Sequence, residues 1–364
     1  MFSISKKIMV FFMCVFQFFL SVFTMSGFKT DAYFTEWTAQ DVYSLDDTIV
    51  LEKQAGEDFV VLNLTDIQIN DGEALTVNSD YSYQLIDELI ARTNPDLIAI
   101  AGDNLLGFLG SYAIVEKLAS LDIPWAIVMG NHDGQDTIVE NWPAKLAADA
   151  DNSLFSFGPR DMGFGNYIIN IKQGDEIIHS LYMMDTHSNN TFTAADGDVV
   201  EGYDHLWPNQ IEWYKWAVNG LAELEGKTVQ STIMFHIPVC EYTAAAKAVF
   251  GDVGGTLNPE YADVAFGEWN EGVCSAPVNN GFFDVVKELG STKDILVGHD
   301  HTNSFSILYE GVRLSYVLKT GFGSYDDVNN NGGSVLTIHD DGTTDFEHIY
   351  ITPDELGFDI DDLN

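Results

Sequence analysis

Apolar and polar positions alternate along the first half of the chain in blocks that predict strands and helices in turn. Short apolar runs at 59–64, 97–101 and 124–129 have the length of buried strands. Between them, the residues around 85–90 and 114–118 place their apolar side chains on one helical face. This order predicts a β-α-β unit, and such units have a right-handed crossover.

The second half of the chain has a different pattern, in which apolar runs come in pairs around short turns. Hairpins are predicted at 167–184, 304–319 and 334–350. Two further strand-like runs, 232–235 and 295–297, end just before histidine residues. The alternation predicts an α/β fold with a mixed pair of sheets and helices on the outside.

Polar segments close five of the apolar runs. They are Asp66-Ile-Gln68, Gly102-Asp103-Asn104, Gly130-Asn131-His132-Asp133, Phe235-His236-Ile237 and Gly298-His299-Asp300-His301. Loops at one edge of a sheet bring together residues that lie far apart in sequence. Any one segment alone is ordinary turn chemistry, but together they supply carboxylates, amides and imidazoles. Two divalent cations that share a bridging carboxylate need this ligand set, which points to hydrolytic attack on phosphorus.

Composition limits the partners of the chain. Its 364 residues contain 46% apolar residues, enough for a large core, and 56 acidic against 16 basic residues give a formal charge of −40. That charge repels a nucleic-acid backbone, so we expect no general nucleic-acid binding. With no repeat or linker, residues 28–351 are predicted to form one domain, and residues 352–364 an acidic, loosely held C-terminal tail.

The N-terminal residues 1–26 have the pattern of a signal peptide. Lys6 and Lys7 precede an apolar stretch at 8–25, and Ser26 permits cleavage after it. The stretch approaches the roughly 20 residues that span a bilayer, so an uncleaved membrane anchor is the alternative. We therefore expect a secreted or extracellular protein, without membrane attachment unless this segment stays uncleaved.

Two cysteines lie beyond the N-terminal stretch, Cys240 and Cys274. An even number suits an oxidising compartment, and the sequence fits either a disulfide or two separate thiols. Asn63-Leu-Thr and Asn189-Asn-Thr match glycosylation acceptors, although Asn63 falls in a predicted strand, which disfavours modification there.

In their order and residue types, the five segments resemble the calcineurin-like metallophosphoesterases. Gly202-Tyr203-Asp204, Gln210-Ile-Glu-Trp-Tyr and Asn280-Gly-Phe-Phe are similar to the purple-acid-phosphatase-like branch of that superfamily. Leu106 stands where the purple enzymes place a ligand tyrosine, so no purple chromophore is expected. The resemblance implies the metallophosphatase fold, a four-layer α/β/β/α sandwich of two mixed β-sheets flanked by helices.

The resemblance also implies which residues hold two divalent metal ions. One ion would be bound by Asp66, Gln68, Asp103 and His301. The other would be bound by Asp103, Asn131, His236 and His299. Asp103 bridges because a carboxylate has two oxygens, and it counts as catalytic together with His132, which would donate a proton to the leaving oxygen. Asp133 and Asp300 are expected to orient imidazoles from behind.

Gln68 departs from the pattern, because most of the family has histidine there. An amide oxygen is a harder ligand than an imidazole nitrogen, so manganese is favoured at this position among manganese, iron, zinc and magnesium. A similar Asp-Ile-Gln opening occurs in the manganese-dependent diphosphatase branch, so glutamine does not by itself imply inactivity.

The predicted function is that of a secreted hydrolase which cleaves phosphate esters with metal-activated hydroxide, first of all a phosphomonoesterase. Its partner would be a small phosphate ester or a phosphorylated substrate. A phosphodiesterase or nucleotide diphosphatase is the first alternative, favoured by Gln68 and by the lack of a basic cluster. A non-catalytic metal-binding surface protein is the second.

Overall fold

The computed structural model describes residues 30–359 and Leu363, except positions 73, 75, 76, 136–140, 194–196 and 323. The predicted signal peptide lies outside the described residues. Within them, no helix combines the length and the apolar character that crossing a bilayer requires.

One sheet of the described chain has five strands. In spatial order they are β15 (Thr344–Tyr350), β14 (Gly332–Ile338), β2 (Phe59–Leu64), β3 (Leu97–Ile100) and β4 (Trp125–Ile127). The last three are parallel, while β14 is antiparallel to β2. The helices on its outer side are α2 (Val77–Thr93), α3 (Phe108–Ala119) and α4 (Trp142–Ala148).

The other large sheet has eight strands. In spatial order they are β1 (Ile49–Glu52), β5 (Tyr167–Gln173), β6 (Glu176–Met183), β9 (Gln230–Met234), β11 (Thr292–Val297), β13 (Val312–Tyr316), β12 (Ser306–Tyr309) and β10 (Ala265–Phe266). β6, β9, β11 and β13 are parallel to one another, and the β5–β6 and β12–β13 hairpins are antiparallel. Its outer helices are α5 (Pro208–Glu225), α6 (Glu241–Phe250) and α7 (Phe282–Leu289).

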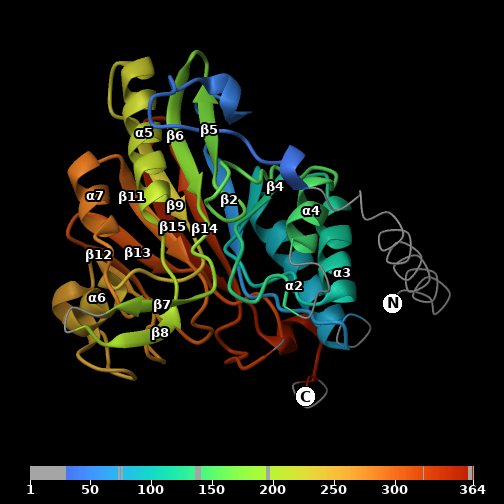
Figure 1. The fold of residues 1–364 in the computed structure, drawn as a ribbon. Helices are drawn as coiled ribbons and strands as arrows, with labels where there is room; N and C mark the ends of the chain where they lie inside the picture. The colour runs from blue at the N-terminus through green and yellow to red at the C-terminus, as the bar shows by residue number, and fades with distance from the viewer. Residues whose placement is uncertain are drawn as a thin grey trace.

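The remaining described elements are short. β7 (Asn189–Thr193) and β8 (Val199–Tyr203) form a separate hairpin. The 3₁₀ turns are η2 (Thr30–Ala32), η3 (Leu45–Asp47), η4 (Pro259–Tyr261) and η5 (Pro353–Leu356). In Figure 1 the two groups of helices lie on opposite sides of the strands, so the predicted four-layer sandwich is confirmed.

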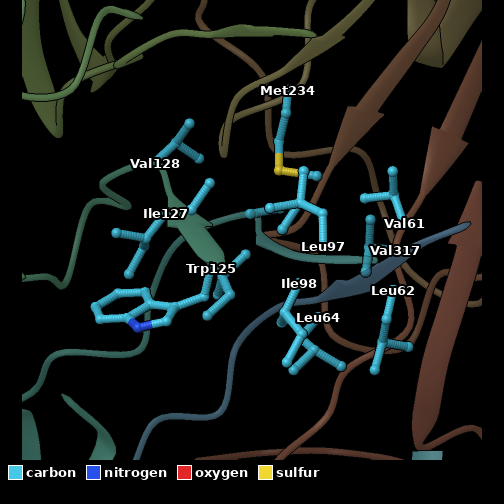
Figure 2. Packing of buried hydrophobic residues seen from close by; sticks show 14 of the residues in the cluster. Val61, Leu62, Leu64, Leu97, Ile98, Trp125, Ile127, Val128, Met234 and Val317 are labelled. Atoms are coloured by element: carbon cyan, nitrogen blue, oxygen red, sulfur yellow. The ribbon is translucent and has the colours of Figure 1, made fainter. Parts of the chain in front are cut away.

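The core has two parts because successive strand residues point to opposite faces of a sheet. Met234 and Leu296 belong to the apolar cluster between the sheets, whereas their neighbours Ile233 and Ile295 belong to the cluster under α5, α6 and α7. Figure 2 shows Met234 from β9 in the same cluster as Val61 from β2. Full burial of each such side chain stabilises the fold by about 1.5–3 kcal/mol.

The strands and hairpins predicted from the pattern are all present, although the strand predicted at 124–129 is shorter, at Trp125–Ile127. The tail differs from the prediction of a loosely held segment. The ring of Phe358 packs edge-on against Tyr81 with 5.5 Å between centroids, and Leu363 is fully buried in the core. Apolar residues at these two positions therefore anchor an otherwise acidic segment.

The open questions about cysteines and glycosylation also receive structural answers. The thiols of Cys240 and Cys274 are both free. Asn63 is buried, and its amide donates to the carbonyl oxygens of Val61 and Ser334, so it is closed to modification. Asn189 lies exposed at the start of β7.

Candidate metal centre

The five polar segments meet at one edge of the molecule. Asp66, Asp103 and Asn131 follow the carboxyl ends of β2, β3 and β4, while His236 and His299 follow β9 and β11 of the other sheet. The two groups are joined across the sheets by hydrogen bonds. The Nδ1–H of His236 donates to the carbonyl oxygen of Ala101 at 2.7 Å, and the backbone N–H of Thr320 donates to Thr65 at 3.0 Å.

The backbone at this edge is strained at four of the predicted ligands. Asp66, Gln68, Asp103 and His299 have φ values of 51°, 49°, 56° and 79°, in the left-handed region that side chains other than glycine rarely adopt. Strain of this kind costs about 1–3 kcal/mol at each residue and gathers at functional sites. The surrounding contacts must therefore hold these residues in place.

Asp133 provides the main contacts that hold the Asp103 turn. Its carboxylate accepts backbone N–H groups from Gly130 at 2.7 Å, Asp103 at 3.0 Å and Asn104 at 2.8 Å. A further N–H comes from Leu105. The loops after β3 and β4 are thus tied to a single carboxylate.

Glycines at this edge are required by close packing. A Cβ atom on Gly298 would lie 2.0 Å from Thr65 Oγ1 and 2.7 Å from Asp66 Oδ2. One on Gly130 would lie 2.2 Å from Asp103 Oδ1. Gly298 therefore leaves room for the carboxylate of Asp66, and Gly130 leaves room for the carboxylate of Asp103.

The side chains predicted for the second ion converge. His236 Nε2 lies 3.2 Å from Asp103 Oδ2 and 3.3 Å from His299 Nδ1. One ligand atom from each of these three residues lies within 4.8 Å of the others. Asn131 reaches the same edge from β4, and its Oδ1 is buried. Such separations suit donors that share one cation at bond lengths of about 2.0–2.2 Å.

The side chains predicted for the first ion also lie together, with one exception in orientation. His301 Nε2 lies 3.3 Å from Asp66 Oδ1, and the Nε2 of Gln68 lies 3.2 Å from His301 Nε2. The Oε1 of Gln68 points instead to Lys319 Nζ, at 3.3 Å. This orientation disagrees with the ligand role that the sequence predicts for Gln68.

Buried ligand atoms without hydrogen bonds test whether a metal fits. Among the described residues, the candidate ligand atoms Asp66 Oδ1 and Asn131 Oδ1 are buried and accept no hydrogen bond. Leaving such an atom unsatisfied costs about 1–3 kcal/mol, and native structures rarely tolerate several together. Carboxylate, amide and imidazole donors that lack protons to share fit divalent cations.

The electrostatics of the pocket also favour a cation. Burial alone would raise the pKa of Asp66 and Asp103, but neighbouring imidazoles hold both below the ordinary value. Burial alone would lower the pKa of His236, yet the carboxylates of Asp103 and Asp66 raise it to about 10. Two buried carboxylates therefore attract positive charge to the point between them.

The groups behind the ligands differ from the expected ones. The Nδ1–H groups of His236 and His301 donate to the carbonyl oxygens of Ala101 and Tyr325, both at 2.7 Å, which leaves each Nε2 facing the centre. Asp133 and Asp300 were expected to orient imidazoles. Asp133 binds backbone N–H groups instead, as described above. Asp300 accepts from the hydroxyl of Tyr316 and the N–H of Cys274. Backbone carbonyls therefore fix the imidazole orientation, and carboxylates fix the loops.

His132 lies at the open side of the centre. Its backbone N–H donates to Asp103 Oδ1 at 2.7 Å, its ring Nδ1 contacts Gln135 Oε1, and the side chain is only partly buried. The Nε2 atom is therefore the ring position that can face a substrate. Asn131 and His132 are adjacent, so the predicted metal ligand and the predicted proton donor share one turn.

Three contacting side chains were not among the predicted site residues. Lys319 is buried beneath Asp66, Tyr203 places its ring edge-on to His299 at 4.4 Å, and Tyr325 stacks on His301 at 4.3 Å. Each lies outside the five motifs and reaches the centre only through the fold.

Comparison with protein-family models decides the family. A model described as calcineurin-like phosphoesterase matches residues 59–303. The chain belongs to this family. The matched region runs from β2 to just beyond β11 and contains every predicted ligand. The predicted class of a metal-dependent phosphoric ester hydrolase is therefore confirmed at the level of the family.

Curated relatives place the chain near purple acid phosphatases. It is 28% identical over 270 residues to the "Probable inactive purple acid phosphatase 14" of Arabidopsis thaliana, covering 67% of this chain and 63% of that protein. It is 25% identical over 274 residues to "Phosphatase DCR2" of Saccharomyces cerevisiae, covering 68% and 45%. The chain thus spans less than two thirds of the length of these relatives.

Among solved structures, the chain is similar to a dimetal phosphatase from Danio rerio. The two are 11% identical with a TM-score of 0.48, and the match covers 81% of this chain and 97% of that one.

Proposed function

We propose that this family member is an exported phosphohydrolase with two divalent metal positions, and that phosphate monoesters are its substrates. The observation that carries the proposal is the convergence of candidate ligand side chains from both sheets, among which the buried oxygens Asp66 Oδ1 and Asn131 Oδ1 have no hydrogen-bond partner among the described residues. Divalent ions bound there would lower the pKa of a water molecule and neutralise phosphate oxygens.

The residues of this chain would supply position and protons. Asp103 directs Oδ2 towards His236 and Oδ1 towards the backbone of His132, so it links the ligands to the proton donor. His132 Nε2 would give a proton to the leaving oxygen while Gln135 holds Nδ1. The rings of Tyr203 and Tyr325 border the ligands His299 and His301 and shape the mouth of the centre.

A phosphodiesterase or nucleotide diphosphatase is the second candidate, and the distribution of basic residues favours it. Among the lysines and arginines of the described residues, Lys319 alone is hydrogen-bonded to predicted ligands, and its side chain is buried. A doubly charged terminal phosphate would then depend on the metals and His132 alone. A diester, with one negative charge, needs less compensation.

A non-catalytic metal-binding protein is the third candidate. Three Arabidopsis relatives bear names that call them probably inactive. Against this, Gln68 is the one predicted ligand that departs from the family pattern, and the chain keeps the expected residue at each of the other predicted ligand positions.

A substrate panel separates the candidates. Purified protein would be given p-nitrophenyl phosphate, bis-p-nitrophenyl phosphate and ADP-ribose with manganese, with an Asp103→Ala preparation as the control for contaminating enzymes. We expect fastest turnover of the monoester and loss of activity with a chelator. Faster turnover of either diester substrate would establish the second candidate, and metal binding without any turnover would establish the third. Export would be tested by sequencing the N-terminus of the mature protein, which we expect to begin after Ser26.

A further inference from the structure

Lys319 occupies an unusual place for a lysine in a metal-binding protein. It lies three residues beyond β13, beside Thr65 in an isolated parallel bridge, and its side chain is buried. Its Nζ donates to the carbonyl oxygen of Asp66 at 2.7 Å and to Oε1 of Gln68 at 3.3 Å. A positive charge is therefore built into the wall of the first metal position.

The ammonium determines which end of the Gln68 amide faces the metal position. A lysine ammonium has three donors and no acceptor, so the atom of Gln68 beside it must be the oxygen. The amide nitrogen then faces inward, 3.2 Å from His301 Nε2 and 3.4 Å from Asp103 Oδ2. An amide NH₂ group donates hydrogen bonds and offers no lone pair to a cation.

The remaining donors are divided unequally between the two positions. The second position has Asp103, Asn131, His236 and His299. The first keeps Asp66, His301 and a share of Asp103. Of the Asp66 oxygens, Oδ2 already accepts from Thr65 Oγ1 at 2.8 Å and from the N–H of His299 at 3.0 Å. Oδ1 is the oxygen that stays open at the first position.

We propose that Lys319 makes the two metal positions unequal by holding the Gln68 oxygen away from the first position and placing a positive charge beside it. One divalent ion then binds tightly at the second position, and another binds weakly at the first. The inference rests on the metal centre of the proposed function, but it concerns loading and not turnover.

Metal titration tests the inference on the folded protein. Metal-free wild type would be titrated with Mn²⁺ by calorimetry, and bound metal would be counted by mass spectrometry after dialysis. We expect one ion to survive dialysis and a second to bind about tenfold or more weakly, the scale on which groups behind metal ligands act. Two ions of equal affinity in the wild type would overturn the inference without any variant.

Two variants then separate the charge from the amide. Lys319→Met removes the ammonium at similar length and frees the Gln68 amide to turn, so the second ion should bind about tenfold more tightly. Gln68→Ala should leave both affinities within about twofold, because the side chain is no ligand in the wild type. A tenfold loss at the weak position in Gln68→Ala, or unchanged loading in Lys319→Met, would contradict the inference.

Lys53→Met is the matched control for Lys319→Met. Lys53 is also buried and also bonded through Nζ, to Gln173 Oε1 and Asp340, but it lies just after β1, beside the end of β5 and away from the centre. The Lys53→Met variant also removes one positive charge from the same acidic chain, and it should leave the Mn²⁺ titration unchanged.

The inference and the proposed function can fail separately. A wild-type protein that hydrolyses phosphate esters and binds two ions with equal affinity would refute the inference but not the proposed function. A protein that binds one ion tightly and hydrolyses nothing would refute the proposed function but not the inference.

Discussion

The imidazole of His236 donates from Nδ1 to the carbonyl oxygen of Ala101, 2.7 Å away, and thereby connects the end of β9 to the end of β3. This bond fixes the tautomer, since a nitrogen that faces a carbonyl must carry the proton. The other nitrogen, Nε2, faces Asp103, 3.2 Å away, and is the ring position that a cation could occupy in place of a proton. The fold therefore prepares a metal ligand by using a backbone carbonyl of the opposite sheet.

Asp103 is predicted to serve both metal positions, so Asp103→Ala should abolish turnover and metal loading together. Removing its carboxylate takes a donor from each position and leaves His236 without its acidic neighbour. We expect less than one bound ion per chain by mass spectrometry and no hydrolysis of p-nitrophenyl phosphate above background. Asp122→Ala, an exposed aspartate before β4, should match the wild type in both assays. Normal metal content in Asp103→Ala would refute the bridging role.

His132 is expected to act on the leaving group and not on the metals. His132→Ala should lower kcat by about 10²–10⁴-fold, the usual contribution of a positioned acid or base. Metal content should stay unchanged, because the contact with Asp103 uses the backbone N–H, which alanine retains. The loss should be smaller for an ester with a good leaving group, which needs less protonation. Metal loss in this variant would show that the ring is a ligand.

Gly298 is predicted to be irreplaceable for steric reasons. Its added Cβ would meet Thr65 Oγ1 at 2.0 Å and press on the carboxylate of Asp66. We expect Gly298→Ala to lower the free energy of unfolding by about 1–3 kcal/mol and to weaken metal binding. Gly272→Ala is the control, because its Cβ would have no atom within 4 Å. Equal denaturation midpoints for the two variants would contradict the crowding argument.

His179 should make stability depend on pH. Burial lowers its pKa from 6.5 to about 4, while it donates to Gly342 O and accepts from Thr232. Between these values the unfolded chain binds a proton that the folded chain does not, so stability is complete above pH 6.5 and falls as the pH drops towards 4. The contribution is about 3 kcal/mol across the whole interval.

The matching variant is His179→Gln, which keeps a donor and an acceptor but does not titrate. At pH 7 the variant should have a lower free energy of unfolding in urea than the wild type. This difference should shrink by about 2.5 kcal/mol at pH 4.5, since the wild type has by then lost most of the stability that depends on neutral His179. The other titrating groups are common to both proteins and cancel. A stability difference that is the same at both pH values would rule out this histidine as the source.

Much of the fold and of the ligand set could be predicted because both depend on local sequence. The apolar runs of β2, β3 and β4 are continuous, and each is soon followed by a candidate ligand. The β7–β8 hairpin was missed because Val199 and Val200 are exposed and Asn189 begins a largely polar strand, so no alternation marks it. Exposed strands give little hydrophobic signal.

The contacts around the ligands could not be predicted, because they arise only when distant strands meet. Nothing near Lys319 in the sequence indicates Gln68, and the contact exists because residue 319 runs beside residue 65. The functions expected of Asp133 and Asp300 were wrong for the same reason. Whether a carboxylate such as that of Asp133 accepts from an imidazole or from backbone N–H groups depends on which loop it faces after folding.

Asp133 has a consequence for how the centre is assembled. Since one side chain gathers N–H groups from Gly130, Asp103, Asn104 and Leu105, the loops after β3 and β4 are already arranged when the polypeptide folds. The entropy lost in ordering them is spent during folding and not when a ligand arrives. An incoming ion then has to displace the proton of His236 and shed its own water but has no loop to order, so binding should leave the backbone where it was.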